Sequence, residues 1–179
     1  LDAIKLKPQQ RLLDIGGGTG TFARLAAARF PEVETAVFDL PQVIASIAPR
    51  YRGTTQVISG NMFEDPIPKT FNTISLVRIL HDHDDDPVDK LLARCFEALP
   101  AGGELIIAEP MADTRGAESI GHTYFGFYLW AMGSGRPRTK HELQAALERA
   151  GFASIKEKRT HIPALVRVVT AKKPGVIFY

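Results

Sequence analysis

Short apolar runs alternate along the chain with longer segments in which apolar residues recur every three or four positions. The runs have the length of buried strands, and the longer segments have the period of amphipathic helices. The predicted strands are Arg11–Ile15, Glu34–Phe38, Thr55–Ile58, Thr73–Val77, Glu104–Ala108, Ser154–Lys158 and Leu165–Ala171. The predicted helices are Thr19–Phe30, Pro41–Ala48, Pro87–Leu99, Glu118–Met132 and Lys140–Ala150. This alternation predicts an α/β fold with a mostly parallel, doubly wound sheet.

The connections at the end of the chain refine this expectation. Only the short segment Arg159–Ala164 separates the last two predicted strands, which is too little chain for a right-handed crossover. The last strand should therefore be antiparallel. Asp86 and Pro87 are expected to supply the N-cap and the first residue of one helix, and Gly151 is expected to end another.

A glycine-rich turn follows the first predicted strand. Residues 12–20 read LLDIGGGTG, and Asp39 comes nineteen residues after Gly20, at the end of the second apolar run. Glycine lets the backbone approach a ligand closely, and the next helix offers its N-terminus to a nucleotide-like group. A carboxylate about twenty residues further on can bind both ribose hydroxyls. The chain is therefore expected to bind an adenosine-containing cofactor.

Two cofactors compete for this turn. Gly18, Gly20 and Ala23 satisfy the dinucleotide spacing G-x-G-x-x-A, which favours a nicotinamide-dependent oxidoreductase. Asp14, Gly16, Gly18 and Gly20 instead spell D-x-G-x-G-x-G, which resembles motif I of the class I S-adenosylmethionine-dependent methyltransferases. An acidic residue at the turn suits a cofactor that carries an ammonium group. Asp14 therefore favours the methyltransferase.

Composition and charge narrow the classes further. The 179 residues fit one domain, and 45% hydrophobic and 23% charged residues are ordinary for a soluble protein. The net charge of +2 is spread along the chain, so no nucleic-acid footprint is visible. The single Cys95 sits in a helical apolar pattern and is expected in the core. No apolar run is long enough for an integral membrane segment, and we expect a cytoplasmic protein.

Polar residues follow three more of the predicted strands. Asn61 could read the adenine amino group while Met62 covers the ring, although a plain strand-end turn is the alternative. His81 is a natural general base, because its unperturbed pKa lies near neutrality. Glu109 ends the next strand and should lie on the same rim, or it could serve as a salt bridge or helix cap.

The acidic run around His81 admits other interpretations. A metal site is one, since residues 81–86 are all His or Asp. The ligands are crowded in sequence, however, and carboxylates at a helix start are explained by capping and by the helix dipole. We therefore expect no metal. A solvated loop histidine is the other alternative, and it fits His83 better than His81. The aromatic segment Glu118–Met132 either packs in the core or walls an apolar acceptor pocket.

Taken together, six segments of the chain resemble the plant-type O-methyltransferase family, which includes caffeate and acetylserotonin O-methyltransferases. They are Leu12–Gly20, Phe38–Pro41, Gly60–Phe63, Arg78–Asp82, Pro100–Gly103 and Arg138–Thr139. Within this family the chain is most similar to bacterial carotenoid hydroxyl O-methyltransferases of the hydroxyneurosporene or demethylspheroidene type. That similarity rests on Leu76–Leu80 leading into Asp82–Asp85, on Tyr124–Tyr128, and on Ala131–Arg136.

The resemblance implies a Rossmann-like class I methyltransferase with a seven-stranded sheet. It implies S-adenosylmethionine as cofactor and methyl transfer to a hydroxyl of an apolar small molecule, such as a hydroxylated carotenoid. His81 then corresponds to the catalytic base, and Glu109 to the acid that orients it. The implied cofactor-binding residues are Asp14, Gly16, Gly18, Gly20, Asp39, Leu40, Asn61, Met62 and Arg78.

The chain also departs from the family. Asn61 stands where Asp is usual, His83 replaces a common tryptophan, and Pro137 replaces a second glutamate of the plant members. The family's N-terminal dimerisation domain is absent, and Leu1 is no initiator methionine. We therefore expect residues 1–179 to be the catalytic domain of a longer, homodimeric protein. A repurposed or inactive cofactor-binding module remains the alternative.

Overall fold

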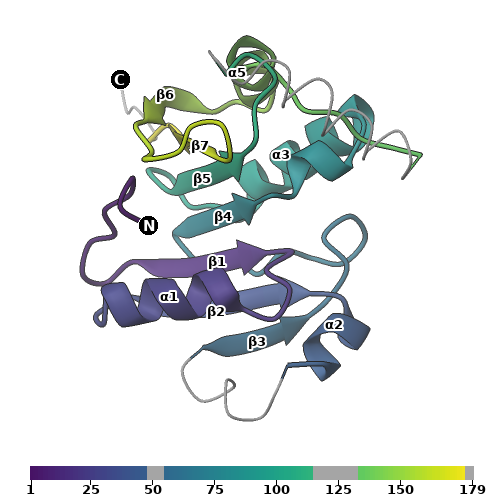
Figure 1. The fold of residues 1–179 in the computed structure, drawn as a ribbon. Coiled ribbons are helices and arrows are strands. Elements are labelled where there is room, and N and C mark those ends of the chain that lie inside the picture. Colours follow the sequence, from purple (N-terminus) through teal and green to yellow (C-terminus); the bar gives the residue numbers. More distant parts are fainter. Residues whose placement is uncertain (48–54, 115–132, 176–179) are drawn as a thin grey trace.

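The computed structural model describes residues 1–47, 55–114 and 133–175. They form a seven-stranded sheet with the strand order β3-β2-β1-β4-β5-β7-β6 (Figure 1). The strands are β1 (Arg11–Ile15), β2 (Glu34–Asp39), β3 (Gln56–Ser59), β4 (Thr73–Val77), β5 (Glu104–Glu109), β6 (Ala153–Lys158) and β7 (Arg167–Lys172). Each predicted strand is present, with its ends shifted by at most two residues.

The first five strands run parallel, and β7 runs antiparallel to both of its neighbours, β5 and β6. The predicted antiparallel last strand is confirmed, because the connection from β6 to β7 is too short to cross the sheet. The chain builds outward from β1 to β3 and then returns to place β4 on the other side of β1. The carboxyl ends of β1 and β4 therefore meet at a switch point, where ligands of such sheets bind.

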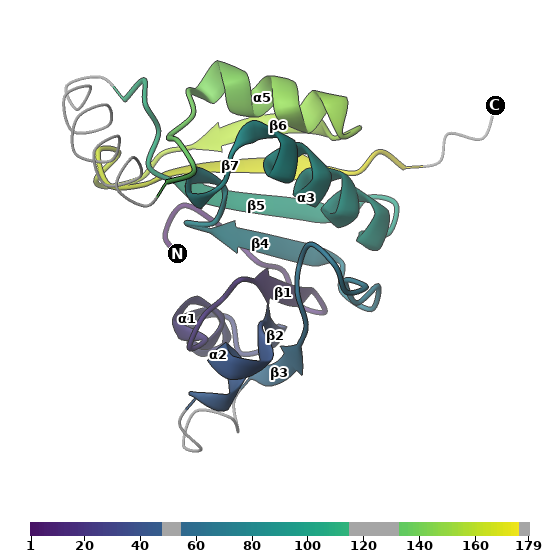
Figure 2. The same cartoon turned by 90° about the vertical axis from the view of Figure 1, so that its right-hand side faces the viewer.

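The described helical segments lie between these strands. They are α1 (Thr21–Arg29), α2 (Pro41–Ala45), the 3₁₀ turn η2 (Leu80–Asp82), α3 (Asp85–Ala98) and α5 (Lys140–Arg149). Helix α1 packs along β1 and β2, whereas α3 and α5 lie side by side (Figures 1 and 2). None of the helices within the described residues is both long enough and apolar enough to span a bilayer.

Strand β1 shows how the two faces of the sheet are covered. Its side chains alternate between the faces, as in any strand. Leu12 packs in one cluster with Ala26 of α1, whereas Leu13 packs in a larger cluster with Leu91 of α3 and Leu147 of α5. The members of both clusters are buried, so the central strand β1 is covered on both faces.

Cys95 of α3 belongs to the larger cluster, as expected. Its side chain is fully buried, and burial raises the pKa of the thiol to about 12. The thiol is therefore protonated at neutral pH and acts as an apolar core group.

The helix ends correct two expectations and confirm another. Helix α3 begins at Asp85 with Asp84 as its N-cap, so the predictions that Asp86 caps this helix and that Pro87 is its first residue were both wrong. Pro87 lies in the first turn, where its missing N–H has no intrahelical partner to lose. Gly151, with a φ of 97°, does follow the end of α5. The predicted helix Glu118–Met132 lies outside the described residues.

Candidate active site

The glycine turn after β1 has the backbone that its sequence requires. Gly16, Gly18 and Gly20 all have positive φ, at 65°, 58° and 78°. Gly20 is the N-cap residue of α1, whose first turn carries no acidic side chain and no side-chain cap. A Cβ added at Gly18 would meet no atom within 4 Å. The turn therefore leaves open space beside a helix N-terminus, which is an arrangement suited to a polar ligand.

Asp39 ends β2 directly beside this turn. Its Oδ2 accepts a hydrogen bond from the Gly18 amide at 2.8 Å, and its Oδ1 accepts one from the Leu40 amide at 2.7 Å. A carboxylate offers about four acceptor sites, so these two bonds leave capacity for hydroxyl donors. Leu40 is the N-cap residue of α2 and makes no side-chain cap of its own, so the Asp39 carboxylate is what binds its amide.

Asp14 lies under the turn rather than on its open side. Its Oδ1 accepts a hydrogen bond from the Ser75 hydroxyl at 2.6 Å, and its Oδ2 has no partner among the described residues. A Cβ added at Gly17 would come within 2.5 Å of that Oδ2. Burial raises the pKa of Asp14 to about 7, against the lowering effect of the Ser75 hydrogen bond, and Asp39 raises it further. The carboxyl can thus gain or lose a proton near neutral pH.

The turn after β3 is fixed by hydrogen bonds. The Asn61 side chain accepts from the Phe63 amide at 2.9 Å, and the Asn61 amide donates to Asp65 at 2.8 Å. Arg94 of α3 donates to the Met62 carbonyl at 2.9 Å and also to the Asp65 carbonyl. These contacts of Arg94 were not predicted, because an arginine in a helix has the sequence pattern of a solvated charge. Asn61 therefore shapes the turn, as in the plain alternative, while Met62 packs against the core.

The end of β4 brings the next candidates to the same edge. Arg78 has a φ of 58°, which is uncommon for a residue with a side chain and is often found at functional sites. Its amide donates to the carbonyl of Ala108 at 2.8 Å. This sharp change of direction leads the chain from β4 into the η2 turn, which carries His81.

His81 and Glu109 form a buried pair. The Nδ1 of His81 lies 2.5 Å from Oε2 of Glu109, and each residue is 4% exposed. The other oxygen, Oε1, accepts from the amides of Ile79 and Leu80 at 2.8 and 2.7 Å. A carboxylate at Nδ1 keeps the ring proton on that nitrogen and leaves the lone pair on Nε2. Asp82 Oδ1 lies 3.2 Å from Nε2, where it can pair with the protonated ring.

His83 differs from His81 in its setting. It is half-buried, and its ring meets Phe63 edge-on at a centroid distance of 5.0 Å. Burial lowers its pKa, although Asp82 acts in the opposite direction. The ring packs against an aromatic neighbour, so the expectation of a freely solvated loop histidine holds only in part.

Two of the aspartates that follow His81, Asp84 and Asp85, accept hydrogen bonds from residues 135–138. Asp84 accepts from the Gly135 amide at 2.9 Å, and Asp85 accepts from Arg136 and Arg138. Across the described ranges, no three His, Cys, Asp or Glu side chains are grouped as they would be around a metal ion. Arg138 was considered in the sequence only as part of a motif, and its buried contacts with the His81 turn were not foreseen.

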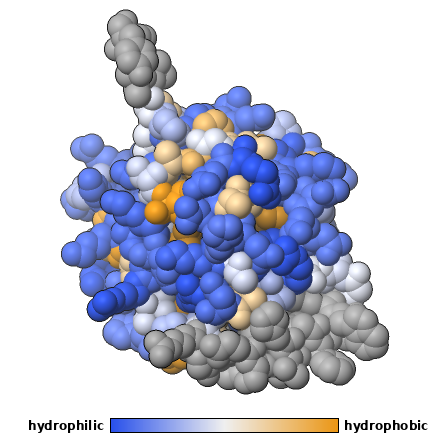
Figure 3. Space-filling model, turned by 90° about the horizontal axis from the view of Figure 1, so that it is seen from above, coloured by the Kyte–Doolittle hydropathy of each residue, from blue (hydrophilic) through white to orange (hydrophobic). Residues whose placement is uncertain are grey.

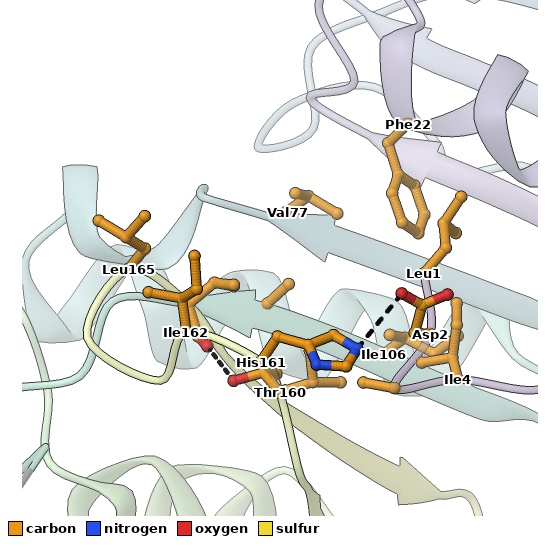
Figure 4. Close-up of a pocket in the computed structure, with 14 residues that line it drawn as sticks. Leu1, Asp2, Ile4, Phe22, Val77, Ile106, Thr160, His161, Ile162 and Leu165 are labelled. Atoms are coloured by element: carbon orange, nitrogen blue, oxygen red, sulfur yellow. Dashed lines mark hydrogen bonds and ion pairs between the residues drawn. The ribbon is translucent and has the colours of Figure 1, made fainter.

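An apolar cavity of about 370 Å³ lies on the face of the sheet that carries Ile106 of β5. Phe22 of α1, Val77 of β4 and Ile106 are among the residues that line it (Figure 4). The polar pair at its edge, Asp2 and His161, is exposed and 3.5 Å apart. Glu109 points to the other face, because it lies an odd number of residues from Ile106. This cavity is therefore separate from the paired histidine and carboxylate.

The described surface seen from the α5 and β6 side is mostly hydrophilic, with small scattered apolar spots (Figure 3).

The candidate site lies at the carboxyl edge of the sheet. The glycine turn, Asp39, Arg78 and the His81–Glu109 pair each end or follow a parallel strand at this edge.

Residues 1–153 match the family described as the O-methyltransferase domain. The chain belongs to this family. It is 41% identical over 173 residues to demethylspheroidene O-methyltransferase of Rhodobacter capsulatus, covering 97% of this chain and 44% of that protein. It is 31% identical to acetylserotonin O-methyltransferase of Mus musculus, covering 91% of this chain and 44% of the relative.

Solved structures share the fold of this chain. Human N-acetylserotonin methyltransferase in complex with SAM (S-adenosylmethionine) superposes with a TM-score of 0.82 at 26% identity, covering 92% of this chain and 47% of that one. LaPhzM superposes with a TM-score of 0.86 at 24% identity, covering 96% and 52%, and supports the fold alone. The expected class I methyltransferase fold is confirmed. The chain spans about half the length of the curated relatives it matches.

Proposed function

We propose that the intact protein is an S-adenosylmethionine-dependent O-methyltransferase that methylates a hydroxyl group of an apolar small molecule. One observation carries the proposal. The glycine turn with its Asp39 carboxylate and the buried His81–Glu109 pair lie on the same carboxyl edge of the sheet. A cofactor-binding turn and a paired base are the two parts that methyl transfer to a hydroxyl needs.

The residues of the turn fit this cofactor. Asp39 would accept the ribose hydroxyls with Leu40 beside it, and the open space at Gly18 would admit the amino-acid part. Beneath it, the Oδ2 of Asp14 has no partner within the described residues and can compensate an ammonium group through the turn. We assign the adenine to the turn of Asn61 and Met62. When bound, S-adenosylmethionine supplies a methyl group that its positive sulfur has already activated.

Gly16, Gly20 and Arg78 are the remaining candidate cofactor-binding residues at this edge of the sheet. Gly16 and Gly20 give the turn its positive-φ backbone on either side of Gly18. Arg78 begins the segment that leads to His81, and we place it next to the cofactor.

His81 takes the proton from the acceptor hydroxyl. Glu109 holds the proton on Nδ1, so Nε2 receives the new proton, and Asp82 at 3.2 Å stabilises the charged ring. An alcohol is far less acidic than an imidazolium, so the proton leaves late, as the oxygen–carbon bond forms. Such a base contributes about 10²–10⁴-fold to the rate. Alignment of the reactants supplies more, about 7–11 kcal/mol in well-oriented cases.

The acceptor that we propose is a hydroxylated carotenoid. Support comes from two relatives, both named demethylspheroidene O-methyltransferase, at 41% and 39% identity. Residues 1–179 are then the catalytic domain, and the whole protein is a cytoplasmic homodimer. Light scattering on the intact protein tests the dimer, and cell fractionation tests the location.

The deciding experiment supplies the intact protein with S-adenosylmethionine and demethylspheroidene and follows the methylated product by mass spectrometry. His81→Ala should keep cofactor binding, measured by calorimetry, and lose most turnover. Turnover that is unchanged in His81→Ala would remove His81 from the mechanism. Binding of NADH in place of S-adenosylmethionine would favour the oxidoreductase. Cofactor binding without methyl transfer to any offered hydroxyl would indicate a repurposed module.

A further inference from the structure

The guanidinium of Arg138 is buried against the turn that carries His81. The residue is 7% exposed, and it precedes α5 rather than belonging to the strands of the site. Its Nη1 donates to the carbonyl of Leu80 at 2.7 Å, and its Nη2 donates to the carbonyl of His83 at 2.8 Å. These two carbonyls flank His81 in the chain. One side chain therefore holds both ends of the turn.

The charge of Arg138 is balanced locally. Its Nε and Nη2 donate to Oδ1 of Asp85 at 3.0 and 2.8 Å. Hydrogen bonds from Arg136, which has the larger effect, and from Arg138 hold the pKa of the Asp85 carboxyl below its usual value. Asp85 is therefore ionised at neutral pH. A buried cation without such a partner would be costly, so the pair explains how the guanidinium can stay under the turn.

The donors of Arg138 are all in use. Besides the four bonds to Leu80, His83 and Asp85, Nη1 reaches the carbonyl of Arg136 at 3.5 Å. A guanidinium has five N–H groups, and each of them has an acceptor here. The side chain thus has no donor left for a substrate. A lysine could not replace it fully, since its single ammonium cannot reach acceptors spread over a planar fork.

Glu109 and Arg138 act on the same turn through opposite groups. Glu109 accepts from the amides of Ile79 and Leu80, while Arg138 donates to the carbonyls of Leu80 and His83. Both charged side chains line one small cavity with His81. The turn is therefore held from two sides by buried charges, and the place of the imidazole depends on both.

We propose that Arg138 is a positioning residue, which fixes the place and angle of the His81 imidazole. The proposal rests on the proposed function, in which His81 takes the hydroxyl proton. A displacement of about 1 Å at a reacting group can cost about 10²-fold in rate. The hydrogen bonds of Arg138 described above go to Leu80, His83, Asp85 and Arg136, and none goes to the glycine turn or to Asp39. Loss of the guanidinium should therefore lower kcat and leave the KM for S-adenosylmethionine unchanged.

The test compares Arg138→Met, Arg138→Lys and the control Arg136→Gln in the intact protein, with demethylspheroidene as acceptor. Arg136 shares the segment and the Asp85 partner, but its side chain is 43% exposed and donates to no carbonyl of the turn. We expect kcat to fall about 100-fold in Arg138→Met, with partial recovery in Arg138→Lys and little change in the control. The KM for S-adenosylmethionine should stay constant throughout.

Histidine NMR gives a readout that needs no turnover. The His81 ring resonances, identified by their loss in His81→Gln, should shift at fixed pH in Arg138→Met and return toward their wild-type positions in Arg138→Lys, while those of the exposed His161 should not change. If the wild type methylates none of the hydroxyl compounds offered, the proposed function fails and the NMR shifts alone decide on Arg138. Unchanged His81 resonances or an unchanged kcat overturn the proposal. If Arg138→Met lowers kcat but also weakens S-adenosylmethionine binding and lowers the melting temperature, Arg138 is merely structural and the proposal is overturned.

Discussion

The Nδ1 of His81 and the Oε2 of Glu109 lie 2.5 Å apart across the ends of two neighbouring strands, β4 and β5. The same carboxylate binds the amides of Ile79 and Leu80 through its other oxygen. Glu109 therefore orients the ring and also fixes the backbone that carries it. A single substitution should disturb both roles in measurably different ways.

Glu109→Gln is expected to lower turnover about 10²-fold or more without changing cofactor affinity. An amide has one oxygen and one NH₂ group. Either the backbone amides lose their acceptor, or the NH₂ group faces Nδ1 and the ring proton moves to Nε2, which is then no base. A buried donor left without a partner should also lower the free energy of unfolding by about 1–3 kcal/mol. Steady-state kinetics and urea unfolding measure the two effects. The control is Glu104→Gln, at the opposite end of β5, and retained turnover in Glu109→Gln would exclude the orienting role.

Asp39→Asn should weaken S-adenosylmethionine binding about 10- to 100-fold, because charge-assisted hydrogen bonds are worth about 1.5–3 kcal/mol. The amide also places a donor near the Gly18 amide, which now donates to Asp39 at 2.8 Å. Calorimetric titration measures the affinity. Asp89→Asn is the matched control, since Asp89 is an exposed carboxylate paired with Arg149. Equal affinities in the two variants would show that Asp39 does not hold the ribose.

Most of the fold could be predicted from the apolar pattern alone. Buried strands such as β1 and β4 leave continuous apolar runs, and both were predicted with their observed ends. The start of α3 could not be placed, because Asp84, Asp85 and Asp86 are equally suitable caps. The structure selects Asp84, and Pro87 is tolerated because any residue of the first turn lacks an intrahelical acceptor for its N–H.

The site was predictable only where one residue at a strand end carries the signal. His81 and Glu109 could be expected on one rim, because the ends of parallel strands meet. Arg94 and Arg138 could not, since each acts on carbonyls from a distant segment and reads as a surface charge in sequence. The position of Asp14 under the turn also depends on a partner, Ser75, that no spacing rule connects to it.

Protonation of Asp14 should make the free energy of unfolding vary with pH. Its folded-state pKa of about 7 lies above the unfolded value, so the folded protein binds this proton more tightly. The free energy of unfolding therefore falls as pH rises from about 4 to about 7, by about 4 kcal/mol at most, and then stays level. Asp14→Asn is neutral throughout and should lose this dependence. Urea unfolding between pH 4 and pH 8 measures it, and parallel curves for the two proteins would contradict the assignment.

Gly18→Ala separates backbone strain from ligand exclusion. Gly18 has a φ of 58° and Gly102 a φ of 77°, and a Cβ added at either would meet no atom within 4 Å. Each alanine variant should therefore lose about 1–2 kcal/mol of stability from left-handed backbone alone. Only the methyl group at Gly18 projects beside the proposed cofactor site, so only that variant should lose S-adenosylmethionine affinity. Urea unfolding and calorimetry on both variants make the comparison. If the affinity is the same in both, the space beside Gly18 is not occupied by the ligand, and the glycine is there for the turn alone.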